Sequence, residues 1–127
     1  MAIFYRKIQR ANPLNRALSK WYPVLKSLGM VKSKEVAKQM ADETTMNPKE
    51  AEIAVYEMVK VTKRLLLSGY TVQLDDLGTF YLTAKAKGSD NESDVTAANV
   101  EGLNIRFRPA ASFKADIAKA ELKAARV

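Results

Sequence analysis

The feature that most constrains the fold is a change of hydrophobic period at Gly69. Before this residue the apolar side chains recur at helical spacing, ending in Leu65–Leu67, and after it they occupy strand positions. Glycine commonly follows the last turn of a helix, because the left-handed backbone there disfavours a Cβ. The segment therefore predicts a helix that ends at Ser68, followed by two strands. The apolar strand positions are Val72, Leu74, Leu77, Phe80 and Leu82.

A capping pattern predicts where that helix begins. Asn47 can accept a hydrogen bond from a free amide of the first turn, Pro48 suits the first helical position, and Glu50 completes a capping box. A shorter amphipathic helix is predicted from Ser33 to about Thr45, so residues 33–68 form a helical hairpin. The apolar positions of the second helix cover more than one stripe. This width predicts two packing partners, one within the subunit and one across a dimer.

Residues 70–108 are predicted to form a sheet and an arm. Asp75-Asp76 reads as a hairpin turn, and Gly78 lies where a missing side chain permits a bulge or a close backbone approach. Thr96–Val100 is expected to form a single helical turn. The cleanest strand follows, because Leu103, Ile105 and Phe107 alternate with polar or basic residues. Residues 109–124 are predicted to form a C-terminal helix entered at a proline.

Residues 1–32 form an N-terminal extension with strand-forming composition. We expect short strands at Ile3–Ile8 and Lys20–Leu25, with Pro23 confining the second to a sheet edge because proline lacks an amide donor. No internal repeat or low-complexity linker interrupts the chain. A single domain over residues 1–127 is therefore predicted.

The formal charge of +7 is unevenly distributed. Residues 1–34 carry +8, residues 35–101 carry −5, and residues 102–127 carry +4. Basic ends and an acidic middle favour a polyanion-facing surface made by the termini, with Lys and Arg contacting phosphates. The alternative is an ordinary basic surface without a nucleic-acid partner.

Composition also narrows the function classes. The chain has no Cys and no His, which removes thiol chemistry, thiolate metal sites and the usual imidazole base. It shows no Gly-rich phosphate loop, no run long enough to span a bilayer and no secretory leader. We therefore expect a cytoplasmic protein that is not an enzyme, with no cofactor, no metal, no membrane partner and no small-molecule substrate.

The succession of helix, Gly69, Val72-Gln-Leu74 and Leu77-Gly-Thr-Phe80 resembles the bacterial HU and integration host factor family of DNA-binding proteins. The resemblance continues through Ile105-Arg-Phe-Arg-Pro109 and covers roughly residues 33–124. With its N-terminal extension, the chain looks most like the longer HU-HIG branch. The resemblance implies an α+β, HU-like fold with two helices, a three-stranded antiparallel sheet with an arm, a C-terminal helix and an N-terminal β extension. It also implies an intertwined homodimer.

The function implied is that of a histone-like, nucleoid-associated protein that binds double-stranded DNA with little sequence preference. A sheet with an apolar underside and a basic upper face can serve as a saddle for a duplex backbone, although exposed strands alternate in this way without any ligand. The expected DNA-binding residues are Lys85, Lys87, Arg106, Arg108, Lys114, Lys119 and Lys123. The expected dimer core is Leu65, Phe80, Leu82, Ile105 and Phe107.

The arm departs from the family pattern. HU-type proteins wedge the proline of an Arg-Asn-Pro motif between base steps, whereas this chain has Gly88–Asp94 there, with three acids and no proline. Intercalation is therefore not carried over, and weaker or less bent DNA complexes are expected. A second hypothesis follows, in which the fold is retained as an interaction or scaffold module whose acidic arm binds a protein partner.

Three other patterns could indicate a binding site, but each has an ordinary structural explanation. Asp90, Glu92, Asp94 and Glu101 match carboxylate positions of a calcium loop, but Val95 replaces its turn glycine, so an acidic turn is favoured. Aromatic residues of the extension can stack on bases but are more often packing residues. Its basic residues can touch phosphate, and simple solvation is favoured for most of them. These basic residues are Arg6, Lys7, Arg10, Arg16 and Lys20, and the aromatic ones are Tyr5, Trp21 and Tyr22.

Overall fold

The computed structural model describes residues 1–126, apart from the side chain of Arg16. Its contacts divide the chain into two compact units. The terminal unit comprises Met1–Lys32 and Asp116–Val127, and the central unit comprises Ser33–Ala115. That both fold together as one domain stays a prediction.

The helical hairpin of the central unit follows its sequence signals. Helix α1 spans Ser33–Glu43 and helix α2 spans Pro48–Leu67. The side chain of Asn47 accepts a hydrogen bond from the Glu50 amide at 2.8 Å and donates one to the Glu50 carboxylate at 2.7 Å. Gly69 follows the helix with φ of 93°. The predicted start and end of α2 are therefore confirmed.

The sheet of the central unit has the order β3-β4-β5 with antiparallel pairing. Strand β3 spans Val72–Leu74, β4 spans Gly78–Ala86 and β5 spans Val100–Pro109. The turn between β3 and β4 places Asp75 at φ of 33°, and the Leu77 amide donates to the Leu74 carbonyl. The predicted hairpin turn at Asp75-Asp76 is thus confirmed.

Gly78 occupies the close approach that the sequence indicated. Its φ is 152°, and a Cβ at this position would meet the Arg108 carbonyl oxygen and lie 2.6 Å from Cε2 of Phe107. No other side chain fits there without a shift of β5. Gly78 therefore lets β4 and β5 pair closely at the base of the sheet.

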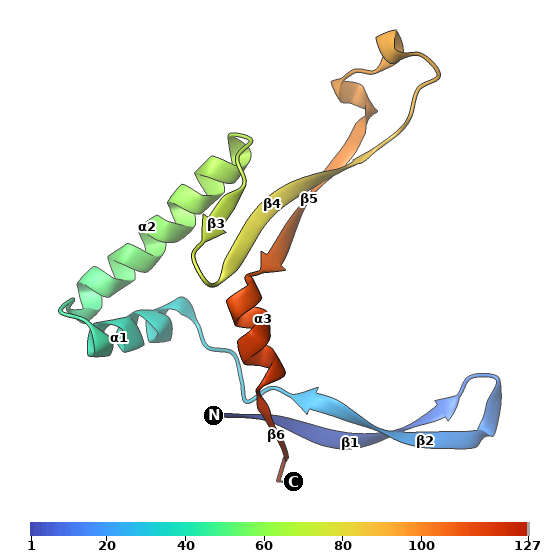
Figure 1. Ribbon diagram of the computed structural model, residues 1–127, viewed down its shortest axis with the longest axis vertical. Helices are drawn as coiled ribbons and strands as arrows, with labels where there is room; N and C mark the ends of the chain where they lie inside the picture. Colours follow the sequence, from blue (N-terminus) through green and yellow to red (C-terminus); the bar gives the residue numbers. More distant parts are fainter. Residues whose placement is uncertain (127) are drawn as a thin grey trace. The chain divides into compact units, whose positions relative to one another are not determined.

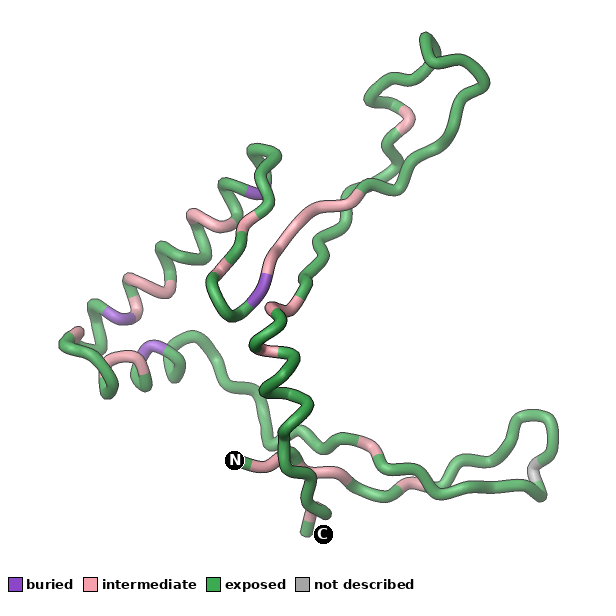
Figure 2. The backbone as a smooth tube through the Cα atoms, in the orientation of Figure 1, coloured by how far each residue is buried: buried purple, intermediate pink, exposed green. Residues whose placement is uncertain are grey.

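Beyond β3, strands β4 and β5 continue as a two-stranded arm (Figure 1). Two single 3₁₀ turns form its tip, η1 at Glu92–Asp94 and η2 at Ala97–Asn99. The second is the helical turn predicted within Thr96–Val100. The arm is built almost entirely of exposed residues (Figure 2).

The terminal unit is a second three-stranded sheet, of order β2-β1-β6. Strand β1 spans Ala2–Asn12 and pairs antiparallel with β2, Asn15–Lys26. Both strands are longer than the sequence predicted, because backbone pairing in a hairpin continues through residues whose side chains do not alternate in polarity. Pro23 lies in the edge strand β2, as predicted.

The prediction of a C-terminal helix over residues 109–124 is wrong in its second half. Helix α3 spans only Ala111–Ala118, and Glu121–Ala124 form strand β6, which pairs in parallel with Ala2–Tyr5 of β1. The Ala125 amide also donates to the Tyr5 carbonyl at 2.8 Å. The edge of β1 that faces away from β2 offers unpaired backbone donors and acceptors, and pairing with them overrides the helical propensity of an alanine-rich segment.

Burial is sparse throughout the described residues (Figure 2). Ala37, Ala51 and Leu66 are the buried apolar residues, and all three belong to the helical hairpin. Of the helices in the described part of the chain, none is long and apolar enough to cross a membrane.

Candidate nucleic-acid interface

The two faces of the β4–β5 ribbon differ in chemistry. Tyr81 lies opposite Arg106 and Thr79 lies opposite Arg108, so these four residues share one face, on which Lys85 also lies. The opposite face carries the pairs Phe80–Phe107 and Leu82–Ile105. The facial assignment predicted from strand alternation is confirmed for the three basic residues.

Arg108 is positioned by a neighbouring ring. Its guanidinium carbon lies 5.2 Å from the centroid of Tyr81, within the range of a cation–π contact. Such a contact orients the guanidinium plane while leaving its donors available to an acceptor such as a phosphate oxygen. Tyr81 is thus a positioning residue, and its closeness to two arginines follows from the β4–β5 register and not from the sequence alone.

The two lysines at the start of the arm share one carboxylate. The ammonium groups of Lys85 and Lys87 lie 3.8 Å and 3.7 Å from the carboxylate oxygens of Glu101. Both lysines are exposed, so each pair contributes at most about 1 kcal/mol and a phosphate can compete for the ammonium. Glu101 was noted in the sequence only for a calcium alternative, and its actual neighbours could not be read without the β4–β5 register.

The remaining expected DNA contacts come from both units. Lys114 is exposed on α3 within the central unit, whereas Lys119 and Lys123 belong to the terminal unit. The ammonium group of Lys123 lies 3.7 Å from the carboxylate of Glu121 on the same strand. The structure therefore divides the predicted set between two units.

Asn99 joins the two sides of the arm tip by hydrogen bonds, a role that the sequence alone did not indicate. Its side-chain amide donates to the Lys87 carbonyl at 3.1 Å and to the Ser89 hydroxyl at 2.8 Å, and its side-chain oxygen accepts from the Thr96 amide at 2.8 Å. The Lys87 amide donates to the Asn99 carbonyl. This network orders an otherwise exposed loop, so the acids that follow Ser89 are presented at a defined tip.

The carboxylates of the arm tip are exposed and separate. Asp94 accepts a hydrogen bond from Asn91 at 3.3 Å, and Glu101 is engaged by two lysines. Among the described residues, no group of three or more acidic side chains is arranged to hold a metal ion.

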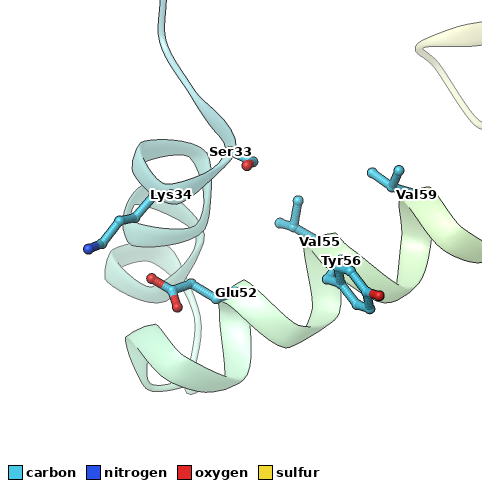
Figure 3. A pocket seen from close by; sticks show the side chains of 6 residues that line it. All are labelled: Ser33, Lys34, Glu52, Val55, Tyr56 and Val59. Carbon is cyan, nitrogen blue, oxygen red and sulfur yellow. The ribbon is translucent and has the colours of Figure 1, made fainter.

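Large apolar side chains remain exposed on both elements of the expected dimer core. Ile105 is 59% exposed and Phe107 41%, although the Phe107 ring packs on Phe80 with centroids 4.8 Å apart. On the hairpin, a hollow of about 460 Å³ opens between α1 and α2. Figure 3 shows Val55 and Val59 projecting on one side of α2 beside this hollow. Both surfaces are therefore open to water.

Comparison with known proteins identifies the family. The family model described as "HU domain fused to wHTH, Ig, or Glycine-rich motif" matches residues 1–124. The chain belongs to the HU-HIG family. The resemblance read from the sequence is thereby confirmed. It extends to the N-terminal strands as well, because the HU-HIG match begins at residue 1.

A solved structure shares the fold of this HU-HIG chain. It is a provisionally assigned bacterial DNA-binding protein from Bacteroides vulgatus ATCC 8482, similar with a TM-score of 0.63 at 10% sequence identity. The similarity covers 98% of this chain and 50% of that one, so the chain spans about half the length of its structural neighbour. No curated protein matches the sequence.

Proposed function

We propose that the chain binds double-stranded DNA with little sequence preference, as a histone-like protein of the bacterial nucleoid in the cytoplasm. The observation that carries the proposal is the shared face of Lys85, Arg106 and Arg108 on the β4–β5 ribbon, in a chain of the HU-HIG family. Basic side chains on one face of a ribbon can neutralise the phosphates of a duplex backbone, and phosphate contacts carry no sequence information. Contacts of this kind give affinity without reading sequence.

A homodimer completes the proposal. The apolar face of β4–β5 and the hollow beside α2 are exposed, and water contact at these surfaces costs free energy in proportion to their apolar area. A second copy of the chain carries the same surfaces, which a two-fold axis can cover reciprocally. The proposed dimer core is Leu65, Phe80, Leu82, Ile105 and Phe107.

The test is binding of a short random-sequence duplex, measured by fluorescence anisotropy across a range of salt concentrations. Each phosphate contact adds about −0.9 to the slope of log K against log salt. We expect a steep slope for the chain and, for the double variant Arg106→Ala with Arg108→Ala, a slope shallower by about 1.8 because two contacts are lost. If the chain did not bind the duplex even at low salt, the proposal would be contradicted.

A second candidate is supported by the arm itself. Asp90, Glu92 and Asp94 are exposed at its tip, and Lys85 and Lys87 already face a carboxylate. An acidic tip is repelled by phosphates, so it fits a basic protein partner better than a minor groove. Replacing these three acids by Asn, Gln and Asn separates the candidates. If this variant binds DNA more tightly than the unaltered chain does, the arm faces DNA and its acids weaken the binding. If DNA binding is unchanged, the tip does not contact DNA and a protein partner is favoured.

A further inference from the structure

The positive charge of the molecule resides in the terminal unit and not in the HU-like sheet. Residues 1–32 and 116–127 contain ten Lys and Arg and two acids, a formal charge of +8. Residues 33–115 contain eleven Lys and Arg and twelve acids, a formal charge of −1. The long-range attraction that brings a polyanion to this chain therefore originates mainly at the β2-β1-β6 sheet.

One face of that sheet collects most of the described basic side chains of β1 and β2. The register places Arg6 opposite Val24, Phe4 opposite Lys26, and Arg10 opposite Lys20, so all of these residues share one face. Within the part of the chain that the structure describes, these four basic side chains form no ion pair. Glu121, the one acid in the three strands, is engaged by Lys123. We call Arg6, Arg10, Lys20 and Lys26 the basic face.

The opposite face of the β1–β2 hairpin carries mainly aromatic and uncharged polar side chains. The side chain of Gln9 donates to the Ser19 hydroxyl at 2.8 Å across β1 and β2, which places both on the same side. Tyr5, Trp21 and Leu25 also lie there with one cation, Lys7, and these four residues line a hollow of about 870 Å³. Among the described basic residues of β1 and β2 that the register pairs, four therefore lie on the basic face, which also carries Phe4, Ile8 and Tyr22, and one lies on the opposite face. Solvation by water alone favours neither face.

Arg10 and Lys20 point to an anionic ligand. They are a directly opposed cross-strand pair, both are exposed, and like charges in such a pair destabilise a sheet. At the other end of the hairpin, Arg6 and Lys26 line a hollow of about 490 Å³ together with Lys7 and Arg126. Repulsion of this kind is relieved when phosphates lie between the cations.

The dimensions fit a nucleic-acid backbone. From the level of Lys26 to the level of Arg10 the chain advances six strand residues, which is about 20 Å. A duplex rises 3.4 Å for each phosphate of a strand, so this length corresponds to about six base pairs. A small anion would use only one end of the basic face, whereas a duplex backbone can use all of it.

We propose that the basic face of the β2-β1-β6 sheet is a second binding surface for double-stranded DNA. This inference rests on the proposed function of DNA binding. It assigns a large part of the affinity to the terminal sheet, where Arg6, Arg10, Lys20 and Lys26 contact phosphates and no base is read.

The test compares three double variants of the full chain, each of which lowers the formal charge by two. Arg10→Ala with Lys20→Ala removes one end of the basic face, and Gln9→Glu with Ser19→Asp alters the opposite face at adjacent positions of the same two strands. Arg106→Ala with Arg108→Ala alters the central sheet. Binding to a random duplex is measured across a salt series, and thermal unfolding of each variant is measured alongside.

We expect the basic-face variant to bind roughly tenfold or more weakly at 0.1 M salt, with a log–log slope shallower by about 1.8. The Gln9–Ser19 variant should keep the wild-type slope. The melting temperature of the basic-face variant should stay equal or rise, because a repulsive cross-strand pair is removed. If Arg10 and Lys20 had a purely structural role, the melting temperature would fall instead. Should the alanine variant not fold, Arg10→Gln with Lys20→Gln repeats the test with longer side chains.

Equal losses in the basic-face and Gln9–Ser19 variants would overturn the inference, because net charge alone would then explain them. An unchanged basic-face variant beside a weakened Arg106–Arg108 variant would also overturn it and leave the proposed function standing. Absence of binding by the unaltered chain would overturn both.

Discussion

At the residue scale, Gly78 shows how one missing side chain shapes the site. Its positive φ and its contact with the Arg108 carbonyl and the Phe107 ring leave no room for a Cβ. This approach sets the β4–β5 register, on which the shared face of Arg106 and Arg108 depends. A substitution here acts on stability and on the site together.

Gly78→Ala should lower the free energy of unfolding by at least about 2 kcal/mol, because it adds backbone strain and a steric clash. The measurement is urea denaturation followed by circular dichroism. Gly102→Ala is the matched control in the same sheet, since a Cβ there meets nothing within 4 Å. If the two variants were equally stable, the close approach at Gly78 would not exist in solution.

Asn47, the N-cap residue of α2, has a role in stability that can be tested by itself. The Asn47 side chain both accepts from and donates to Glu50. Asn47→Ala should cost about 1 kcal/mol of stability by leaving a first-turn amide without its partner. Asn47→Asp keeps the acceptor and should retain most of that stability in the same denaturation experiment, so equal losses in the two variants would contradict a capping role.

At the element scale, the sequence predicted what local chemistry determines. The α2 boundaries followed from Asn47, Pro48 and Gly69, and the facing residues of β5 followed from its two-residue alternation. Strand β6 could not be predicted in this way, because its partner β1 lies more than a hundred residues earlier in the chain. The Glu101 ion pairs depend on the β4–β5 register, and the division of the basic residues between two units depends on the β1–β6 pairing. Neither could be predicted from the local sequence.

The pairing of β6 with β1 can be tested by removing one donor. Ala125→Pro eliminates the amide that donates to the Tyr5 carbonyl, and hydrogen exchange of the amides in residues 121–124 should become roughly fivefold to tenfold faster, a loss of about 1 kcal/mol of local protection. Ala125→Gly keeps the amide and serves as the control. Unchanged exchange in the proline variant would show that β6 is held by other contacts.

At the scale of the whole molecule, a chain with three buried apolar residues among those described has most of its apolar surface in water. In the proposed homodimer, the exposed faces of β5 and α2 are the surfaces that the second copy of the chain covers. Dimerisation would also double the number of basic faces available to one duplex, which raises the effective affinity for DNA without new contacts on either subunit.

The dimer proposal predicts different outcomes for two neighbouring residues of β5. Ile105 and Asn104 point to opposite faces of the ribbon, and both Ile105→Asp and Asn104→Asp lower the formal charge by one. Ile105→Asp would place a carboxylate in the apolar core of the dimer, a burial cost of several kcal/mol, so sedimentation should show monomer or loss of folded protein. Asn104→Asp should remain dimeric, because its side chain faces away from that core. A dimer that survives Ile105→Asp would require a different interface.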